Sequence, residues 1–388
     1  MREISPRLLW LLTTTAAVTA ANIYISQPLL EEIGHSFGQL PARTGLVLTL
    51  TQLGYVAGLV LLAPLGDVVE KKKLLLAMLG VDILVTLAAG LTTSFAVFLT
   101  LAFAVGFTNV QAQLVFPYVA GHQNGSRNLG MVLSACLVGV LLSRTLSGLV
   151  GEHLGWRAVY VVMALGLSLL ALVLYRTMPV APPDDRLSYS ELLASLYGLF
   201  LSRPQVRSIA LTGALIYGSL MAFWASLAFY LQGPAFGLRP DAVGAFGLIG
   251  LAGALASNLT GRYLDRLQVK QFLLALIALM LLSYLVLLVS GPSIPVLVVA
   301  VVLLDLGAQG ASISNQSEIY RLYNDARTRL NTIYKVVYFL GAALGSALST
   351  WAWQHQGWSG VCLVGIGMLL LAGLNLKLQP TYEPAVAA

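Results

Sequence analysis

The chain has 388 residues, of which 58% are hydrophobic and only 10% are charged. Soluble domains carry about 25% charged residues, so this composition excludes an ordinary soluble protein and indicates one that crosses a membrane several times. The net charge of +6 does not indicate nucleic acid as a partner, because the basic residues are scattered among short connections. Only helix bundles and closed barrels satisfy their backbone hydrogen bonds in lipid, and continuous apolar runs of about 20 residues favour helices. We therefore expect an all-α membrane protein.

Twelve apolar segments follow one another along the chain. The expected spans are residues 8–28, 44–65, 74–92, 95–119, 129–150, 156–178, 208–231, 242–261, 271–290, 294–317, 331–353 and 358–378. The long connection 179–207 divides the chain into a predicted N-terminal six-helix bundle, 1–178, and a C-terminal one, 208–388. Within it, Ser188 and Glu191 have the spacing of a capping box and precede an apolar stripe. This pattern predicts a short amphipathic helix on the cytoplasmic membrane surface.

The basic residues indicate the orientation in the membrane. With both termini in the cytoplasm, 17 of the 22 Lys and Arg residues fall on the cytoplasmic side and 3 fall outside. Cytoplasmic loops of membrane proteins carry an excess of Lys and Arg. We therefore expect both termini to be cytoplasmic.

Landmarks of the first half recur in the second. Three matches occur in the same order at offsets of 198, 201 and 202 residues: Asp67 with Asp265, Gly106 with Gly307, and Gly155-Trp156 with Gly357-Trp358. Such parallel repeats place a binding site between the two halves near the bilayer midplane.

Polar or aromatic stripes mark the first, fourth, seventh and tenth segments, which hold equivalent places in the repeat. Together with two tyrosines of the eleventh segment, they predict a shared substrate cavity lined by Thr19, Asn22, Asn109, Gln113, Tyr217, Trp224, Gln309, Ser312, Gln316, Tyr334 and Tyr338. The alternative is that these polar side chains only join neighbouring helices through hydrogen bonds.

Three ionisable residues lie deep in the apolar segments: Asp82, Arg144 and Asp305. A charge at the centre of a spanning helix costs about 2.5–3.5 kcal/mol, so such residues usually face a cavity or a partner. Arg144 and Asp305 lie at similar depths, and we expect them to pair across the halves or to be bridged by substrate. Such a pair could load and release a proton, although Asp305 could instead only hydrogen-bond a neighbouring helix. Asp82 is a weaker candidate for proton coupling, because its helix is expected to be peripheral, and Lys335 is expected to reach the cytoplasmic interface.

Neither a cofactor nor an enzymatic activity is expected. Cys136 and Cys362 lie in separate segments and the four histidines occur singly near segment ends, so no disulfide or metal site is predicted. The sequence contains no His-Glu-x-x-His motif and no phosphate-binding loop. The short connections also argue against a receptor or scaffold.

The connection after the second segment reads Ala63-Pro-Leu-Gly-Asp67-Val-Val-Glu-Lys71-Lys-Lys73. It resembles the signature loop of the major facilitator superfamily, with Ala63 and Glu70 standing where glycine is usual. A second copy, Gly261-Arg-Tyr-Leu-Asp265-Arg266, follows the eighth segment. The resemblance covers essentially the whole chain. It implies two six-helix pseudo-repeats, the major facilitator fold, and gating loops that use Asp67, Lys71, Asp265 and Arg266.

The fifth segment carries Gly139, Ser143-Arg144 and Ser147-Gly148. It resembles the antiporter motif of proton-coupled drug exporters, with Arg144 in place of the usual proline. The blocks Asn22–Pro28, Ser143–Gly148 and Arg327–Thr332 are also similar to those of the bacterial arabinose-efflux-permease-like branch. The resemblance implies a monomeric transporter of the bacterial inner membrane that exports a small organic molecule in exchange for protons by alternating access. A proton symporter or a facilitative uptake transporter of a small solute is the alternative.

Overall fold

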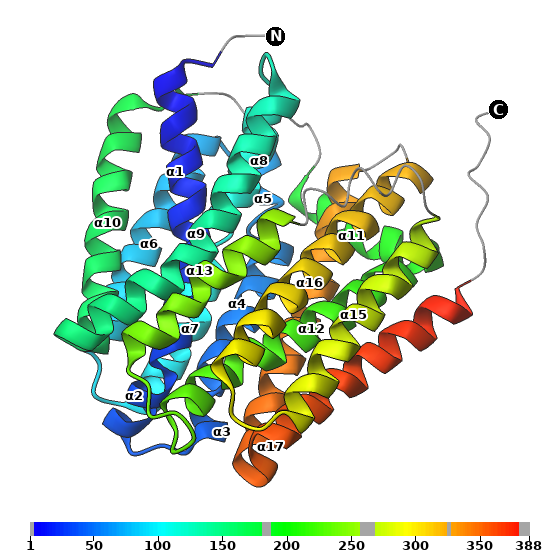
Figure 1. The fold of residues 1–388 in the computed structure, drawn as a ribbon. Helices are drawn as coiled ribbons and strands as arrows, with labels where there is room; N and C mark the ends of the chain where they lie inside the picture. Colours follow the sequence, from blue (N-terminus) through cyan, green and yellow to red (C-terminus); the bar gives the residue numbers. More distant parts are fainter. Residues whose placement is uncertain (1–3, 181–187, 257–267, 324–326, 380–388) are drawn as a thin grey trace. The chain divides into compact units, whose positions relative to one another are not determined.

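The structure is a computed structural model that describes residues 4–180, 188–256, 268–323 and 327–379 (Figure 1). Within these ranges every regular element is helical. In chain order the helices are α1 (Pro6–Asn22), the short 3-10 helix η1 (Gln27–Leu29), α2 (Leu30–Phe37), α3 (Pro41–Thr44), α4 (Leu46–Leu61), α5 (Leu65–Val68), α6 (Lys71–Leu91), α7 (Phe95–Thr108), α8 (Gln111–Ala120), α9 (Gly125–Leu154), α10 (Trp156–Thr177), α11 (Tyr189–Ser202), α12 (Pro204–Gln232), α13 (Pro240–Ala256), α15 (Val269–Val289), α16 (Ile294–Leu322) and α17 (Arg327–Leu378).

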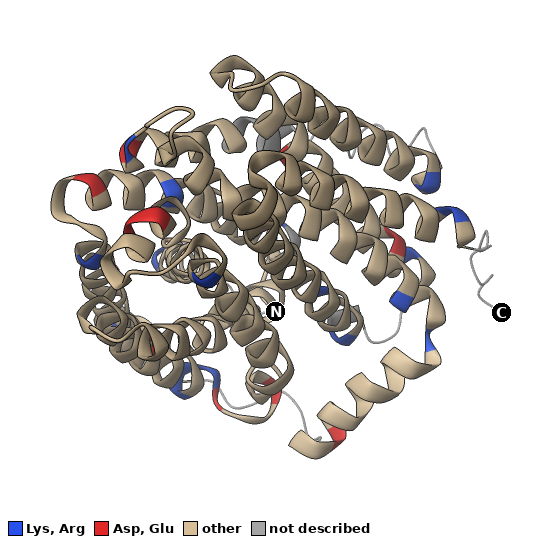
Figure 2. Cartoon of the chain, turned by 90° about the horizontal axis from the view of Figure 1, so that it is seen from below, with Lys and Arg blue, Asp and Glu red and all other residues tan. Residues whose placement is uncertain are grey.

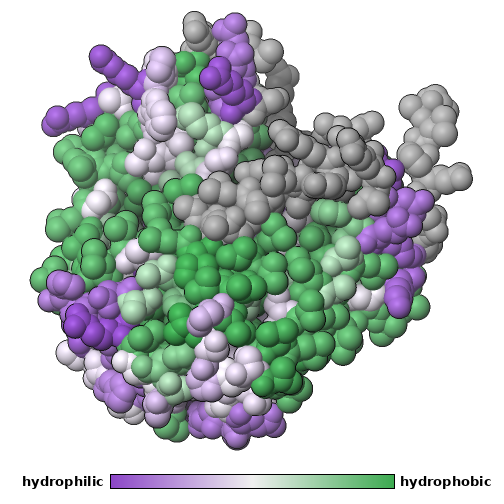
Figure 3. Space-filling model, in the orientation of Figure 1, coloured by the Kyte–Doolittle hydropathy of each residue, from purple (hydrophilic) through white to green (hydrophobic). Residues whose placement is uncertain are grey.

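Ten helical stretches in the described ranges are long and apolar enough to cross a membrane. They agree with the twelve predicted segments, because α17 covers the last two and α13 begins the eighth. The break within α17 is at Gly357, whose φ of 61° and ψ of −146° are not helical. Most of the ribbon is neither acidic nor basic (Figure 2). Hydrophobic residues cover the middle of the visible face, and hydrophilic residues gather toward its edges (Figure 3).

The predicted capping box at the start of α11 is confirmed. The Ser188 amide donates to Glu191 Oε2 at 2.7 Å, and the Glu191 amide donates to Ser188 Oγ at 3.4 Å. These reciprocal bonds satisfy two backbone donors that a helix start otherwise leaves unpaired. Hydrogen bonds from Ser188 also lower the pKa of the exposed Glu191 carboxyl.

The chain divides into two compact units. Unit 1 comprises Met1–Leu193 and Gly237–Leu248, and unit 2 comprises Ala194–Phe236 and Ile249–Ala388. In unit 1, α4 packs on α7, α1 on α9 and α6 on α10; in unit 2, α12 packs on α17 and α15 on α16. The assignment of residues 1–178 and 208–388 to two functional halves stays a prediction.

The same close helix crossing occurs in each unit. A Cβ on Gly139 of α9 would meet the carbonyl oxygen of Ala17 in α1, and one on Gly341 of α17 would meet that of Ala214 in α12. Small residues allow such close backbone approach in membranes. Gly139 and Gly341 are 202 residues apart, which matches the offset of the Gly-Trp landmarks. Gly155 and Gly357 likewise share a positive φ, 81° and 61°, at a helix boundary. The pseudo-repeat is therefore expressed in backbone geometry.

Candidate functional site

Asp82 is the centre of a buried polar cluster in unit 1. Its side chain is 0% exposed and lies among α6, α1 and the end of α7. Asp82 Oδ1 accepts hydrogen bonds from four side chains: Asn109 Nδ2 at 2.9 Å, Asn22 Nδ2 at 3.2 Å, Thr108 Oγ1 at 3.2 Å and Thr86 Oγ1 at 3.3 Å. One carboxyl oxygen thereby joins three helices.

Three other oxygens of this cluster have no donor within the described part of the chain. Asp82 Oδ2, Asn22 Oδ1 and Asn109 Oδ1 are all buried without a hydrogen-bond partner among the described residues. In the same part of the chain, no Lys, Arg or His forms an ion pair with Asp82. A buried charge without a partner costs several kcal/mol. The cluster thus contains more acceptors than donors, and a proton on Asp82 would both add a donor and remove the charge.

Sequence reasoning made Asp82 the weaker candidate for proton coupling because it considered the whole helix rather than one of its faces. Part of α6 is indeed peripheral, since Leu84 is 68% exposed. Asp82 and Thr86, four residues apart, lie on the opposite, buried face. That spacing of an acid and a hydroxyl was the available signal. The contact between Asp82 and Asn109 could not be predicted from the sequence, because it depends on how α7 packs against α6.

Arg144 is 3% exposed and lies inside unit 1. Its Nε donates to Gln27 Oε1 at 2.6 Å, and its guanidinium group lies 5.5 Å from the centre of the Tyr24 ring. Sequence reasoning did not identify Gln27 as its partner. Asp305 is 2% exposed and belongs to unit 2, so its pairing with Arg144 stays a prediction.

The second half of α9 packs closely on residues 237–248 of unit 1. A Cβ on Gly148 would meet the Pro240 carbonyl oxygen, and Thr145 Oγ1 donates to the Gly244 carbonyl oxygen at 2.9 Å. The sequence motif that resembles the antiporter motif thus provides a glycine contact between two helices.

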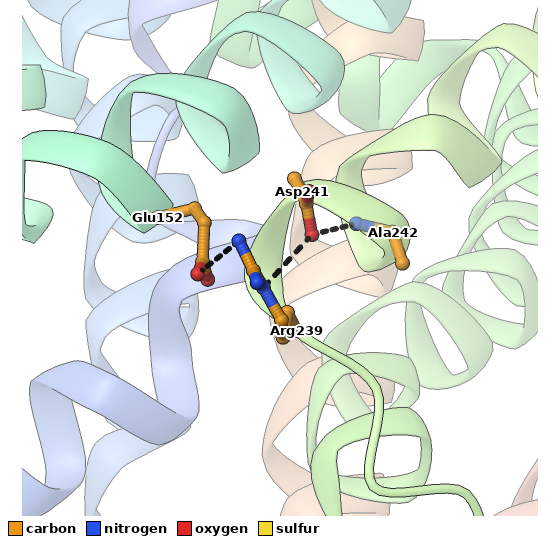
Figure 4. A network of polar contacts seen from close by, with 4 residues as sticks. All are labelled: Glu152, Arg239, Asp241 and Ala242. Carbon is orange, nitrogen blue, oxygen red and sulfur yellow. Dashed lines mark hydrogen bonds and ion pairs between the residues drawn. The ribbon is translucent and has the colours of Figure 1, made fainter.

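An ion pair stands beside this glycine contact (Figure 4). Arg239 Nη2 lies 2.6 Å from Glu152 Oε1, and Arg239 Nε lies 4.0 Å from Asp241 Oδ1. The Ala242 amide donates to the same Asp241 oxygen at 2.7 Å. Arg239 therefore links the end of α9 to the start of α13.

The predicted polar face on α16 is helical as expected. Asp305 and Ser312 are buried, Gln309 and Gln316 are half-buried, and Ile313 on another face is exposed. Gln316 Nε2 donates to both the Ser312 hydroxyl and the Ser312 carbonyl oxygen at 3.0 Å. The face exists, and its role in binding substrate stays a prediction.

Aromatic rings from α12 and α17 meet in unit 2. Tyr217 and Tyr338 stack with centroids 4.0 Å apart and an interplanar angle of 13°, and Tyr334 lies 5.5 Å from Tyr338. Lys335 Nζ lies 5.0 Å from the Tyr338 centroid and 5.8 Å from that of Tyr334. Its amine therefore lies over the faces of two rings, one of them a turn further along α17. The expected reach of Lys335 toward the cytoplasmic interface stays a prediction.

The remaining predicted residues have varied surroundings. Thr19 Oγ1 donates to the Thr15 carbonyl oxygen of its own helix at 2.9 Å, and Trp224 is buried beside Phe223. Gln113 Nε2 donates to Tyr55 Oη at 3.1 Å, joining α8 to α4.

Of the predicted gating residues, Asp67 lies in α5 and Lys71 begins α6 with its side chain buried. Asp265 and Arg266 lie outside the described residues. The gating role of all four stays a prediction.

Comparison with known proteins extends over both units. A family model described as "Major Facilitator Superfamily" matches residues 12–320 and 235–387. The chain is 36% identical over 372 residues to the uncharacterized transporter YgaY of Escherichia coli O157:H7, covering 95% of this chain and 94% of that protein. It is 26% identical over 365 residues to a protein of Pasteurella multocida (strain Pm70) named "Probable sugar efflux transporter", covering 92% and 87%. The crystal structure of the nucleoside transporter NupG has a similar fold, with a TM-score of 0.75, 14% identity, and 95% and 98% coverage.

Proposed function

Because this chain belongs to the major facilitator superfamily and is a multi-pass membrane transporter rather than an enzyme, we propose that it exports a small organic molecule in exchange for protons, with Asp82 as the group that carries the proton. The observation that carries this proposal is the fully buried carboxyl of Asp82, with four donors on one oxygen and, among the described residues, none on the other.

The chemistry of the cluster suits a proton carrier. When Asp82 is charged, the four donors stabilise the carboxylate but leave a net charge in a buried place. When a proton occupies Oδ2, the charge is removed and the surplus of acceptors is reduced by one. The hydrogen bonds favour the charged carboxylate, whereas burial favours the protonated form. Because these two effects oppose each other, a modest change in the surroundings of Asp82 decides whether it holds the proton.

The same cluster offers a link from protonation to helix movement. Asn22 ends α1, Asn109 directly follows α7, and both donate to the oxygen of an α6 residue. Loss of the negative charge weakens these charge-assisted bonds. Protonation would therefore loosen α1 and α7 from α6 and favour one of the two states of alternating access.

Two observations support the proposal of export rather than uptake. One is the name of the Pasteurella multocida relative, a probable sugar efflux transporter. The other is the resemblance of α9 to an antiporter motif, which here packs Gly148 on the segment that begins α13. The Arg144–Asp305 pair, the gating loops and a monomeric state belong to the same proposal, in a bacterial inner membrane with both termini in the cytoplasm.

The test uses everted vesicles in which an acridine dye reports the pH gradient. Arabinose, uridine and benzoate are added in turn, and export coupled to protons dissipates the gradient. We expect D82N to abolish this response while retaining counterflow of the same solute in proteoliposomes, because exchange requires no net proton movement. E191Q, an exposed acid on α11, is the matched control. Undiminished gradient-driven transport by D82N would remove Asp82 from the mechanism.

A further inference from the structure

Within the described part of unit 2, several donor groups of α16 and α17 have no hydrogen-bond acceptor. Lys335 makes no ion pair and no hydrogen bond within the described part of the chain, and its amine lies over the ring faces of Tyr334 and Tyr338. The Tyr334 hydroxyl and Asn315 Nδ2 are also buried without a hydrogen-bond partner there. These three groups come from adjacent helices, α17 and α16.

The three groups are close enough to form one site. Tyr334 directly precedes Lys335, and its hydroxyl faces Ser312 and Asn315 of α16 without reaching a bond of normal geometry. Tyr338, which lies under the Lys335 amine, is stacked on Tyr217 of α12. An ammonium group, a hydroxyl and an amide are thus placed beside a flat aromatic wall.

The rings do not fully compensate the amine. Lys335 is half-buried; the attraction of its cation to an aromatic face is modest, and an ammonium group partly removed from water needs hydrogen-bond acceptors as well. Its three N–H donors require oxygen acceptors. A ligand that brings several acceptor oxygens and a negative charge satisfies the amine, the hydroxyl and the amide together.

We propose that Lys335, Tyr334 and Asn315 bind the anionic group of the transported molecule, and that the stacked pair Tyr217 and Tyr338 packs against its flat apolar body. The substrate class is an aromatic or similarly planar organic anion, with a carboxylate or a phosphate ester as the charged group. This inference rests on the proposed transport function and specifies its substrate.

Lys335, Tyr338 and Asn315 each contribute a different interaction with the ligand. Lys335 supplies charge, so its loss weakens anions selectively. Tyr338 supplies a face, so its loss weakens flat ligands of either charge. Asn315 supplies a hydrogen bond, which is directional but uncharged. A purely structural role for Lys335 would instead lower stability without changing the preference for anions over neutral isosteres.

Binding is measured in detergent, without a pH gradient, by the shift of the thermal transition on adding benzoate, phenyl phosphate, benzamide, arabinose or uridine. Benzamide is the neutral counterpart of benzoate. We expect wild-type protein to be stabilised by benzoate or phenyl phosphate and not by benzamide at the same concentration. The larger of the two anion responses identifies the charged group.

Variants locate the site. K335Q is expected to weaken binding of the preferred anion by tenfold or more, the usual size for a hydrogen bond to a charged group, and K335R to restore part of it. K377Q, which changes an exposed lysine of the same helix, is the matched control and should bind as wild type. Unchanged anion binding by K335Q, or equal or better binding of benzamide, arabinose or uridine by the wild type, would overturn the inference.

Different results would contradict the proposed transport function and the proposed substrate class. Gradient-driven transport of arabinose or uridine without any anion binding would overturn the substrate class and leave the transport function intact. Anion binding that depends on Lys335, with no gradient-driven movement of benzoate, would overturn proton-coupled export and leave the binding site intact. D82N, whose change lies in the other unit, should still bind the anion.

Discussion

At the scale of single residues, unit 1 buries an acid among donors and unit 2 places an amine over two ring faces. Both residues were visible in the sequence as charges in apolar segments. What the sequence did not show was their surroundings, because Asn22, Thr108 and Asn109 meet Asp82 only after α1, α6 and α7 have packed. Gln27 opposite Arg144 and Tyr55 opposite Gln113 were missed for the same reason. The spacing of residues along the sequence predicts which of them share a helix face. Which side chains that face contacts depends on how the helices pack.

The Asp82 cluster predicts an energetic coupling that can be measured without substrate. N109A removes the shortest bond to Asp82 Oδ1, 2.9 Å, and should lower the free energy of unfolding by about 1–3 kcal/mol. In a D82N background the loss should be smaller, because the charge that Asn109 stabilises is gone. Residues of one hydrogen-bond network usually show interaction energies of about 0.5–3 kcal/mol.

Thermal unfolding of the four proteins in detergent measures this cycle. N375A is the control, since Asn375 bonds to Ser208 and Thr212 within unit 2. Its effect should be the same with and without D82N. Additive losses for N109A and D82N would show that the cluster does not act as one network.

At the scale of whole elements, the helices were largely predictable, because runs of apolar residues of spanning length admit few other structures in lipid. Proline and glycine marked several boundaries: α12 begins at Pro204, and the break in α17 falls at Gly357. The close crossings of α1 with α9 and of α12 with α17 were less predictable. A glycine in the sequence indicates a possible close approach but does not identify the partner, as Gly139 and Gly130 show.

These crossings predict opposite effects for two glycines of α9. A Cβ on Gly139 would lie 2.5 Å from the Ala17 carbonyl oxygen, whereas one on Gly130 would meet nothing within 4 Å. G139A should therefore destabilise the protein by about 1–3 kcal/mol through overpacking. G130A should be neutral or stabilise it by up to about 1 kcal/mol, as alanine favours helix over glycine. Thermal unfolding of both variants in detergent tests this, and equal effects would contradict the close crossing.

The start of α11 makes a prediction about pH. Hydrogen bonds from Ser188 lower the pKa of Glu191. A carboxyl whose folded pKa is depressed stabilises the folded state at higher pH, and this contribution is lost as the pH falls through the folded pKa. The carboxyl carbon resonance of Glu191 should therefore titrate below the usual 4.5. S188A should move that midpoint back toward the usual value, and an unchanged midpoint would contradict the capping box.

At the scale of the whole molecule, alternating access by the predicted halves 1–178 and 208–388 requires α9 to separate from the segment that begins α13. That contact is held by Thr145 on Gly244 and by Glu152 on Arg239. In a background with Cys136 and Cys362 replaced by serine, the pair E152C and R239C, which replaces the two ion-paired side chains, should be joined through disulfides by a bis-methanethiosulfonate reagent. Vesicle transport should then fall to baseline and return on reduction. The control pair S208C and N375C links α12 to α17 inside one predicted half, and its cross-linking by the same reagent should leave transport largely intact. Transport that survives the first cross-link and fails with the second would mean that the moving bodies are divided elsewhere than at the 179–207 connection.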